Sequence, residues 1–263
     1  MMHPRLSVDA MCSFQWPFER ELALWKDMGV QHAGLLMNKV ADDPERHLDA
    51  LDDAGIHIST LITAGFQLGD PASWSATRAV HRAMIDLVAS RKGHSIYFTT
   101  GRTVSCDWDE DLALFAEAVA PTVKYGQERG VIAAFEPTLR TNVSFCGSLS
   151  DAIEIAEVTG LGIVSDFGNN WAERGLRETV KRAMPHLALA QIGDIAISSA
   201  GGRSHIGKGD LPLERMLGDI LDAGYEGVFD LEVVPADYTA ETNEDELREG
   251  IRAASDLLYA MKI

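Results

Sequence analysis

At its centre the chain reads Glu128-Arg129-Gly130-Val131-Ile132-Ala133-Ala134-Phe135-Glu136: the end of a helical segment, a glycine and a short apolar strand. A glycine just past a helix can adopt the left-handed conformation that closes the last turn. A short apolar strand directly afterwards is typical of a parallel sheet buried on both faces. The same unit recurs at residues 24–37, 51–62 and 222–232. This repetition predicts alternating helices and parallel strands.

Eight segments can be counted as strands, and a helical segment follows each of them. They lie at residues 5–11, 32–38, 56–63, 94–100, 131–136, 162–166, 187–193 and 228–234. Eight strand–helix units in 263 residues predict an α/β chain that folds as a single-domain (β/α)8 TIM barrel over residues 1–263. The alternative is an open doubly wound sheet, which usually carries a glycine-rich phosphate loop after an early strand. The sequence contains no such loop.

Composition and charge limit the classes of function. The chain has no apolar run long enough to cross a membrane, and residues 1–6 lack the features of a signal peptide. Its formal charge of −17 disfavours a nucleic-acid partner, although a local basic patch would be compatible with it. Cys12, Cys106 and Cys146 are widely spaced and form no metal-finger or redox-pair pattern. We therefore expect a cytoplasmic protein without a membrane or nucleic-acid partner.

Polar side chains end four consecutive predicted strands: Glu136, Asp166, Gln191 and Glu232. The carboxyl ends of barrel strands converge on one mouth, where catalytic groups lie. Three carboxylates in one patch repel one another unless a cation or protons offset their charge. Carboxylate and amide oxygens suit a hard divalent ion. One such residue alone could be a solvated loop residue or a helix cap, but four in succession predict a site for one Mn²⁺ or Mg²⁺ ion.

The chain resembles the xylose isomerase-like TIM-barrel superfamily, the sugar phosphate isomerases and epimerases. The matching stretches are Phe135-Glu136-Pro137, Val164-Ser165-Asp166, Gln191-Ile192-Gly193-Asp194, Gly207-Lys208-Gly209-Asp210, Ala223-Gly224-Tyr225-Glu226-Gly227 and Leu231-Glu232. The resemblance spans essentially the whole chain, and its closing run is the most specific part. It implies that Glu136, Asp166 and Glu232 bind the metal, and that the protein can form homo-oligomers.

The chain departs from the family pattern at three positions. Gln191 stands where the family usually has a histidine, although hydroxypyruvate isomerases and some 3-dehydroshikimate dehydratases of the superfamily also use glutamine there. Asn169 replaces the histidine that often follows strand six, and an amide cannot shuttle a proton near neutral pH. Thr138 stands where some dehydratases carry a catalytic histidine, which counts against that particular chemistry. Metal binding is still expected.

The expected reaction is proton transfer at a carbon next to a carbonyl, in a small carbohydrate or keto acid. Glu136 and Glu232 would be the proton-transfer pair, and the metal would stabilise the enediolate. This predicts an isomerase or epimerase. A dehydratase or lyase is the closest alternative, because an enediolate can also expel a β-hydroxyl. A DNA-repair endonuclease of the superfamily needs more histidine ligands and a basic surface, and a barrel without catalysis would be expected to lack a ligand.

Several other residues are candidates for contact with the substrate. They are Trp16, Asn169, Trp171, Asp194, Arg203 and His205. The two tryptophans follow predicted strands and could equally be packing residues. Arg203, His205 and Lys208 could hold a phosphate or carboxylate, or could belong to a solvated glycine-rich loop. Asp194 could instead support a neighbouring residue or cap the next helix.

Three further side chains are weaker candidates or structural residues. Lys39, just after the second predicted strand, is a weaker candidate for holding an anion. His57 and His94 lie at strand starts, which is the opposite end of a barrel from its active site. We expect both histidines to be structural.

Overall fold

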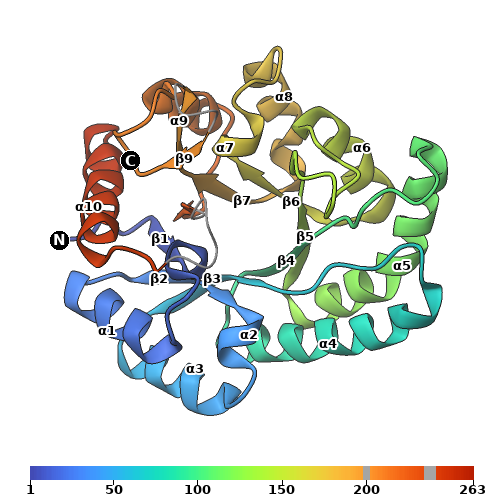
Figure 1. Ribbon diagram of the computed structural model, residues 1–263, viewed down its shortest axis with the longest axis horizontal. Coiled ribbons are helices and arrows are strands. Elements are labelled where there is room, and N and C mark those ends of the chain that lie inside the picture. Colours follow the sequence, from blue (N-terminus) through green and yellow to red (C-terminus); the bar gives the residue numbers. More distant parts are fainter. Residues whose placement is uncertain (198–201, 234–240) are drawn as a thin grey trace.

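The computed structural model describes residues 1–197, 202–233 and 241–263, and in it eight parallel strands close a barrel in the order β1-β10-β7-β6-β5-β4-β3-β2 (Figure 1). These are β1 (Leu6–Asp9), β2 (His32–Leu36), β3 (His57–Ile62), β4 (Ser95–Thr99), β5 (Ile132–Glu136), β6 (Gly162–Asp166), β7 (Leu187–Ile192) and β10 (Phe229–Leu231). The predicted (β/α)8 TIM barrel is confirmed. All eight predicted strands occur, with ends up to two residues shorter than expected, and residue 234, the predicted end of the last strand, lies outside the described residues.

The first strand illustrates why the predicted ends were too long. Residues 10 and 11 belong to the 3-10 helix η1 (Ala10–Ser13) rather than to β1. The Asp9 carboxylate accepts a hydrogen bond from the Met11 backbone N–H at 2.7 Å, so the chain turns immediately after the strand. Apolar residues 10 to 12 had suggested a longer strand, but they are buried in the turn.

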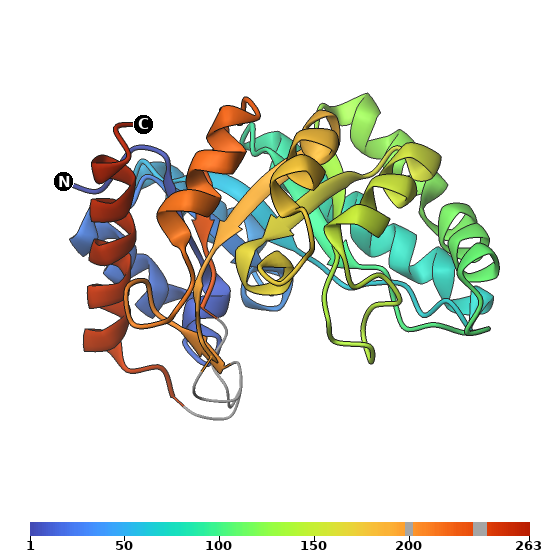
Figure 2. The same cartoon turned by 90° about the horizontal axis from the view of Figure 1, so that it is seen from above.

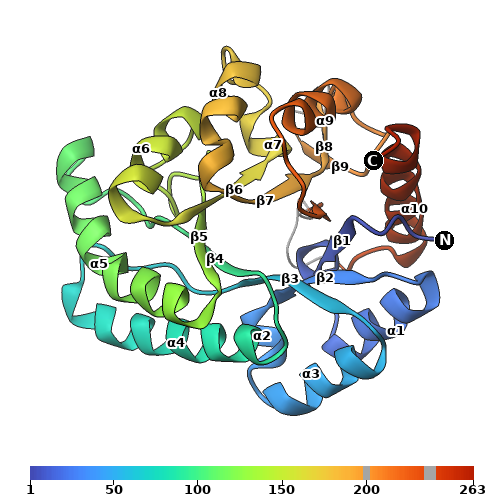
Figure 3. The same cartoon turned by 180° about the vertical axis from the view of Figure 1, so that it is seen from behind.

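Helices surround the strands on all sides (Figures 1 and 3). They are α1 (Phe18–Met28), α2 (Met37–Val40), α3 (Pro44–Asp53), α4 (Trp74–Ser90), α5 (Trp108–Arg129), α6 (Leu149–Thr159), α7 (Phe167–Asn170), α8 (Leu176–Ala183), α9 (Leu213–Asp222) and α10 (Glu244–Ala260), with the 3-10 helices η2 (Pro71–Ser73) and η3 (Met184–His186). Gly130 ends α5 with a φ of 70°, as the central stretch of sequence predicts. In the described ranges, no helix has the length and apolar character needed to cross a membrane.

The two ends of the chain lie close together beside α10 (Figures 1 and 2). The His3 ring is 2.7 Å from the Ile263 carbonyl oxygen, and the His3 backbone N–H donates to the Ser255 hydroxyl of α10 at 2.9 Å. The last helix is therefore tied to the segment that precedes the first strand.

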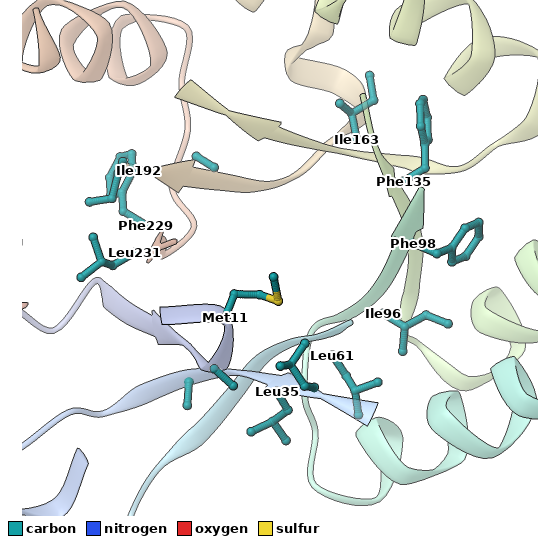
Figure 4. Close-up of a cluster of buried hydrophobic side chains, with 14 of the residues drawn as sticks. Met11, Leu35, Leu61, Ile96, Phe98, Phe135, Ile163, Ile192, Phe229 and Leu231 are labelled. Atoms are coloured by element: carbon teal, nitrogen blue, oxygen red, sulfur yellow. The ribbon is translucent and has the colours of Figure 1, made fainter. Parts of the chain in front are cut away.

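Side chains of each strand alternate between two environments, as a strand requires. Outward residues pack between the strands and the helices, and Figure 4 shows Phe98, Phe135 and Ile163 among them, pointing away from the barrel interior. A second, smaller apolar cluster contains Tyr97 and Val164, which alternate with these residues. Glu136 directly follows the outward-facing Phe135, and Asp166 lies three residues after the outward-facing Ile163. Both side chains therefore face the interior of the barrel.

A β-hairpin follows the seventh barrel strand. Its strands β8 (Asp194–Ala196) and β9 (Gly202–Ser204) are antiparallel, with Ile195 opposite Arg203. The sequence also allows a solvated glycine-rich loop for this segment. In its described part the segment is instead ordered by strand pairing, and this pairing fixes the position of Arg203.

Candidate active site

The four predicted metal ligands come together at the carboxyl ends of neighbouring strands. Glu136 ends β5, Asp166 ends β6, Gln191 lies near the end of β7, and Glu232 directly follows β10. Asp166 is the register partner of Gln191, and the backbone N–H of Glu232 donates to the Ile192 carbonyl at 3.0 Å. All four side chains are buried, with exposed fractions between 0% and 4%.

Burial of the two glutamates changes their acid–base properties. Burial and, to a lesser extent, the negative charge of Asp166 together raise the pKa of Glu136 to about 7, against the opposing effect of Arg140 and Arg203. Burial also raises the pKa of Glu232 well above its usual value, with added repulsion from Glu136 and Asp166. These groups therefore resist ionisation together unless positive charge is added, which is the behaviour expected of carboxylates that share a site.

The Gln191 amide lies among acceptors. Its Nε2 is 3.0 Å from the Tyr97 hydroxyl and 3.3 Å from Asp230 Oδ2, and it also donates to Glu232 Oε2. Its carbonyl oxygen, Oε1, is buried and has no hydrogen-bond partner within the described ranges. A buried acceptor without a partner costs about 1–3 kcal/mol, so this oxygen has an unused capacity to bind a cation or a donor.

Arg203 is the residue of the β8–β9 hairpin that reaches the cluster. Its guanidinium binds Asp166 through two hydrogen bonds, Nη1 to Oδ1 at 3.0 Å and Nη2 to Oδ2. This position depends on Gly168, because a Cβ atom there would lie 1.9 Å from Arg203 Nη1. Asp166, a predicted metal ligand, is thus already paired with the positive charge of Arg203. The spacing of residues in the sequence does not indicate this pair.

Asn169 joins two sides of the cluster. Its Nδ2 donates to Glu136 Oε1 at 2.7 Å, and its Oδ1 accepts from Arg203 Nη2 at 3.3 Å. The Thr138 hydroxyl lies 3.5 Å from the same Asn169 oxygen. Two of the three positions at which the sequence departs from the family pattern, Thr138 and Asn169, are therefore in contact with one another beside Glu136.

Asp194 and His205 are placed away from these carboxylates. The Asp194 carboxylate accepts four backbone N–H bonds, at 2.9–3.2 Å, from Ile195, Gly207, Gly209 and Leu211. Its oxygens hold the loop that leads into α9. The His205 ring packs against α10, where a Cβ on Gly250 would lie 2.5 Å from His205 Nδ1. A role for either residue in binding substrate stays a prediction.

The two tryptophans take different positions. Trp16 is buried, and the guanidinium of Arg20 stacks on its ring at 3.8 Å from the centroid. Trp171 directly follows α7 (Phe167–Asn170), is half-buried and packs against the main apolar core. Packing accounts for these observations, and contact with a substrate stays a prediction for both.

The weaker cationic candidates are engaged in ion pairs. Lys39 is buried and bonds to Glu21 and to the Ser13 carbonyl oxygen, at 2.8 Å from the latter. Lys208 is exposed and lies 2.9 Å from Glu249. Lys39 therefore stabilises the turn after β1. His57 and His94 lie at the amino ends of β3 and β4, as expected, and His94 Nε2 is 3.0 Å from the Ala188 carbonyl oxygen.

Sequence reasoning missed several polar residues inside the barrel, among them Asp9, Tyr97 and Asp230. These three are buried, and Tyr97 also donates to Glu232 Oε2 at 3.2 Å. Asp230 could have been found, because it lies two residues before Glu232 and so faces the same side of the strand. Tyr97 lies across the barrel from Gln191, and that proximity follows only from closure.

The comparisons with known proteins agree with this architecture. A family model described as the xylose isomerase-like TIM barrel matches residues 22–257. The chain belongs to this family. A search of curated protein sequences finds no match.

Solved structures with the same fold cover nearly the whole chain. SMc04130 from Sinorhizobium meliloti 1021 is 19% identical with a TM-score of 0.86, covering 96% of this chain and 98% of its own. An L-ribulose 3-epimerase is 16% identical with a TM-score of 0.80, covering 98% and 95%. The IOLI protein, with a bound zinc atom, is 17% identical with a TM-score of 0.76, covering 98% and 97%. At these identities the similarity establishes the fold.

Proposed function

We propose that the protein is a divalent-metal-dependent isomerase or epimerase of a small polyhydroxy ketone, aldehyde or keto acid. The observation that carries the proposal is the buried Gln191 Oε1, which has no partner in the described ranges and lies in a site with three buried carboxyls. Such a set of oxygens is chemically suited to Mn²⁺ or Mg²⁺. Family membership and the similarity to an epimerase and to a zinc-containing protein support this proposal.

The oxygen atoms of these residues suit a divalent metal ion, but Asp166 would have to give up part of its contact with Arg203. Across residues 1–197, 202–233 and 241–263, no group of three or more His, Cys, Asp or Glu side chains is arranged to hold an ion. Asp166 is instead turned to Arg203. A carboxylate has about four acceptor positions, so Asp166 can keep part of this contact and still offer an oxygen to a cation. Glu136, Asp166, Gln191 and Glu232 would hold the ion, which would supply Lewis acidity toward substrate oxygens.

The two glutamates would be the proton-transfer pair, acting from different parts of the barrel mouth. Glu136 on β5 and Glu232 after β10 are separated around the barrel by β6 and β7. A substrate at the centre of the mouth would therefore lie between them. One glutamate removes a proton from the carbon next to the carbonyl, and the other, or the same one, returns it to a new carbon or face.

Neighbouring side chains fix both glutamates. Asn169 Nδ2 holds Glu136 Oε1, while the Tyr97 hydroxyl and the Gln191 amide hold Glu232 Oε2. Each glutamate thus has one oxygen restrained by neutral donors. Restraint of this kind keeps a proton-transferring group at the position that the reaction requires.

Solvent-deuterium exchange tests the proposed reaction. The Mn²⁺-loaded protein is incubated in D₂O with a panel of ketoses, aldoses and keto acids, and products are analysed by mass spectrometry and NMR. We expect deuterium at the carbon next to the carbonyl, with Glu136→Gln and Glu232→Gln each losing turnover. Wild-type rates in both variants would contradict the assignment, and a product lighter by one water would make the enzyme a lyase.

A further inference from the structure

We infer that Asp230 is a positioning residue, which orients the Gln191 amide so that its oxygen, and not its NH₂ group, is left for a cation. This inference rests on the proposed function and adds a residue to it. Asp230 lies on β10, opposite Gln191 in strand register, and its side chain is fully buried.

The contacts of Gln191 define the orientation. Its Nε2 faces Tyr97 Oη at 3.0 Å, Asp230 Oδ2 at 3.3 Å and Glu232 Oε2. Each of these three groups has an oxygen that can accept a hydrogen bond from NH₂. If the amide were turned over, Oε1 would face these acceptors and the NH₂ group would lose them. The observed arrangement is therefore the one that gives the NH₂ group its partners.

Only one of the three acceptors is available for this role alone. Glu232 is itself a proposed metal ligand, so its oxygens would also be needed by the ion. The Tyr97 hydroxyl can donate as well as accept, and it would tolerate either orientation of the amide. Asp230 is the remaining acceptor: its Oδ2 accepts from the Gln191 NH₂ group, and its Oδ1 accepts from the Ser7 hydroxyl.

Asp230 is in turn held in place from the far side. The Ser7 hydroxyl donates to Asp230 Oδ1 at 2.5 Å, and Ser7 Oγ lies 2.7 Å from Ser59 Oγ. These contacts leave Oδ2 for Gln191. A chain of buried polar side chains from β3 through β1 to β10 therefore ends on the amide of β7. Partners behind a metal ligand commonly change metal affinity 10–100-fold when they are replaced.

A double-mutant cycle separates orientation from simple loss of charge. Mn²⁺ affinity is measured by calorimetry and by the EPR signal of free Mn²⁺ in the wild type, Asp230→Asn, Gln191→Ala and the double variant. Asparagine has the shape of aspartate but can pair with either end of the Gln191 amide. We expect Asp230→Asn to weaken binding about 10–100-fold with Gln191 present, and less than about threefold in the Gln191→Ala background. An equal loss in both backgrounds, or no loss in either, would overturn the inference.

A second measurement tests the orientation in metal-free protein. The side-chain NH₂ signals of Gln191 are assigned in ¹⁵N-glutamine-labelled protein as those missing from Gln191→Ala. We expect one slowly exchanging pair of signals in the wild type, and doubled or broadened signals in Asp230→Asn. Unchanged signals would refute the role of Asp230. If the signals change but the wild type binds no Mn²⁺, the orientation stands and the metal-dependent function fails.

Discussion

Replacement of Arg203 by methionine tests whether Asp166 needs a cation beside it. Asp166 is fully buried and Arg203 has 18% of its side chain exposed, so the pair is largely shielded from water. Arg203→Met removes both guanidinium bonds and leaves Asp166 with the backbone N–H of Gly168, at 2.9 Å, as a donor.

The expected cost follows from the burial of the two partners. Breaking a buried ion pair by removal of one partner typically destabilises a protein by 3–5 kcal/mol. The partial exposure of Arg203 lets water reach the vacated side, so we expect about 3 kcal/mol in metal-free protein, at the low end of that range. Added Mn²⁺ should recover much of the loss, because Asp166 freed from Arg203 would bind the ion more tightly than in the wild type, and a ligand stabilises the folded state more the more tightly it binds.

The assay is urea unfolding in EDTA and again in saturating Mn²⁺. Lys181→Met is the matched control, since Lys181 pairs with Glu178 at 2.8 Å but the two side chains are 44% and 72% exposed. We expect a change below about 1 kcal/mol for that variant in both conditions. The reasoning is refuted if Arg203→Met costs no more than the control, or if Mn²⁺ leaves its deficit unchanged.

Three further changes have defined outcomes. Gly168→Ala should displace the Arg203 guanidinium, so it should cost about as much as Arg203→Met in urea unfolding, and the double variant no more. Burial raises the pKa of Glu21 from 4.5 to about 7, against the pull of Lys39. Its protonated form therefore stabilises the fold below pH 4.5, and about 3 kcal/mol of this stability is lost as pH rises through 7. Urea unfolding at several pH values should show that the free energy of unfolding depends less on pH in Glu21→Gln. Asp194→Ala should remove the acceptor of four backbone N–H groups and lower the free energy of unfolding by about 2–4 kcal/mol, whereas an unchanged urea midpoint would contradict its structural role.

The fold and the order of its strands could be predicted because both depend on local patterns. Glycine-ended helices and short apolar strands repeat along the chain, and a barrel places the polar residue after each strand at one mouth. Glu136 and Asp166 were therefore predictable from sequence order alone. Strand lengths were less predictable. The Asp9 carboxylate accepts a hydrogen bond from the Met11 N–H, and this contact ends the strand although the apolar pattern continues.

The partners of these residues could not be predicted, because they depend on contacts between distant segments. Arg203 reaches Asp166 through a hairpin whose pairing the sequence did not indicate, over a glycine at position 168. Tyr97 and Gln191 are 94 residues apart and meet across the barrel. Likewise, the position of Lys39 after β2 suggested an anion site, and its burial against Glu21 was visible only in three dimensions.

The central claim is that this barrel mouth binds one divalent ion. We would titrate the metal-free protein with Mn²⁺ and measure bound metal per chain in the wild type and in Glu232→Gln, after confirming by urea unfolding that the variant is folded. We expect close to one Mn²⁺ per chain in the wild type and loss of tight binding in the variant. Absence of bound metal in the wild type at excess Mn²⁺ would contradict the account.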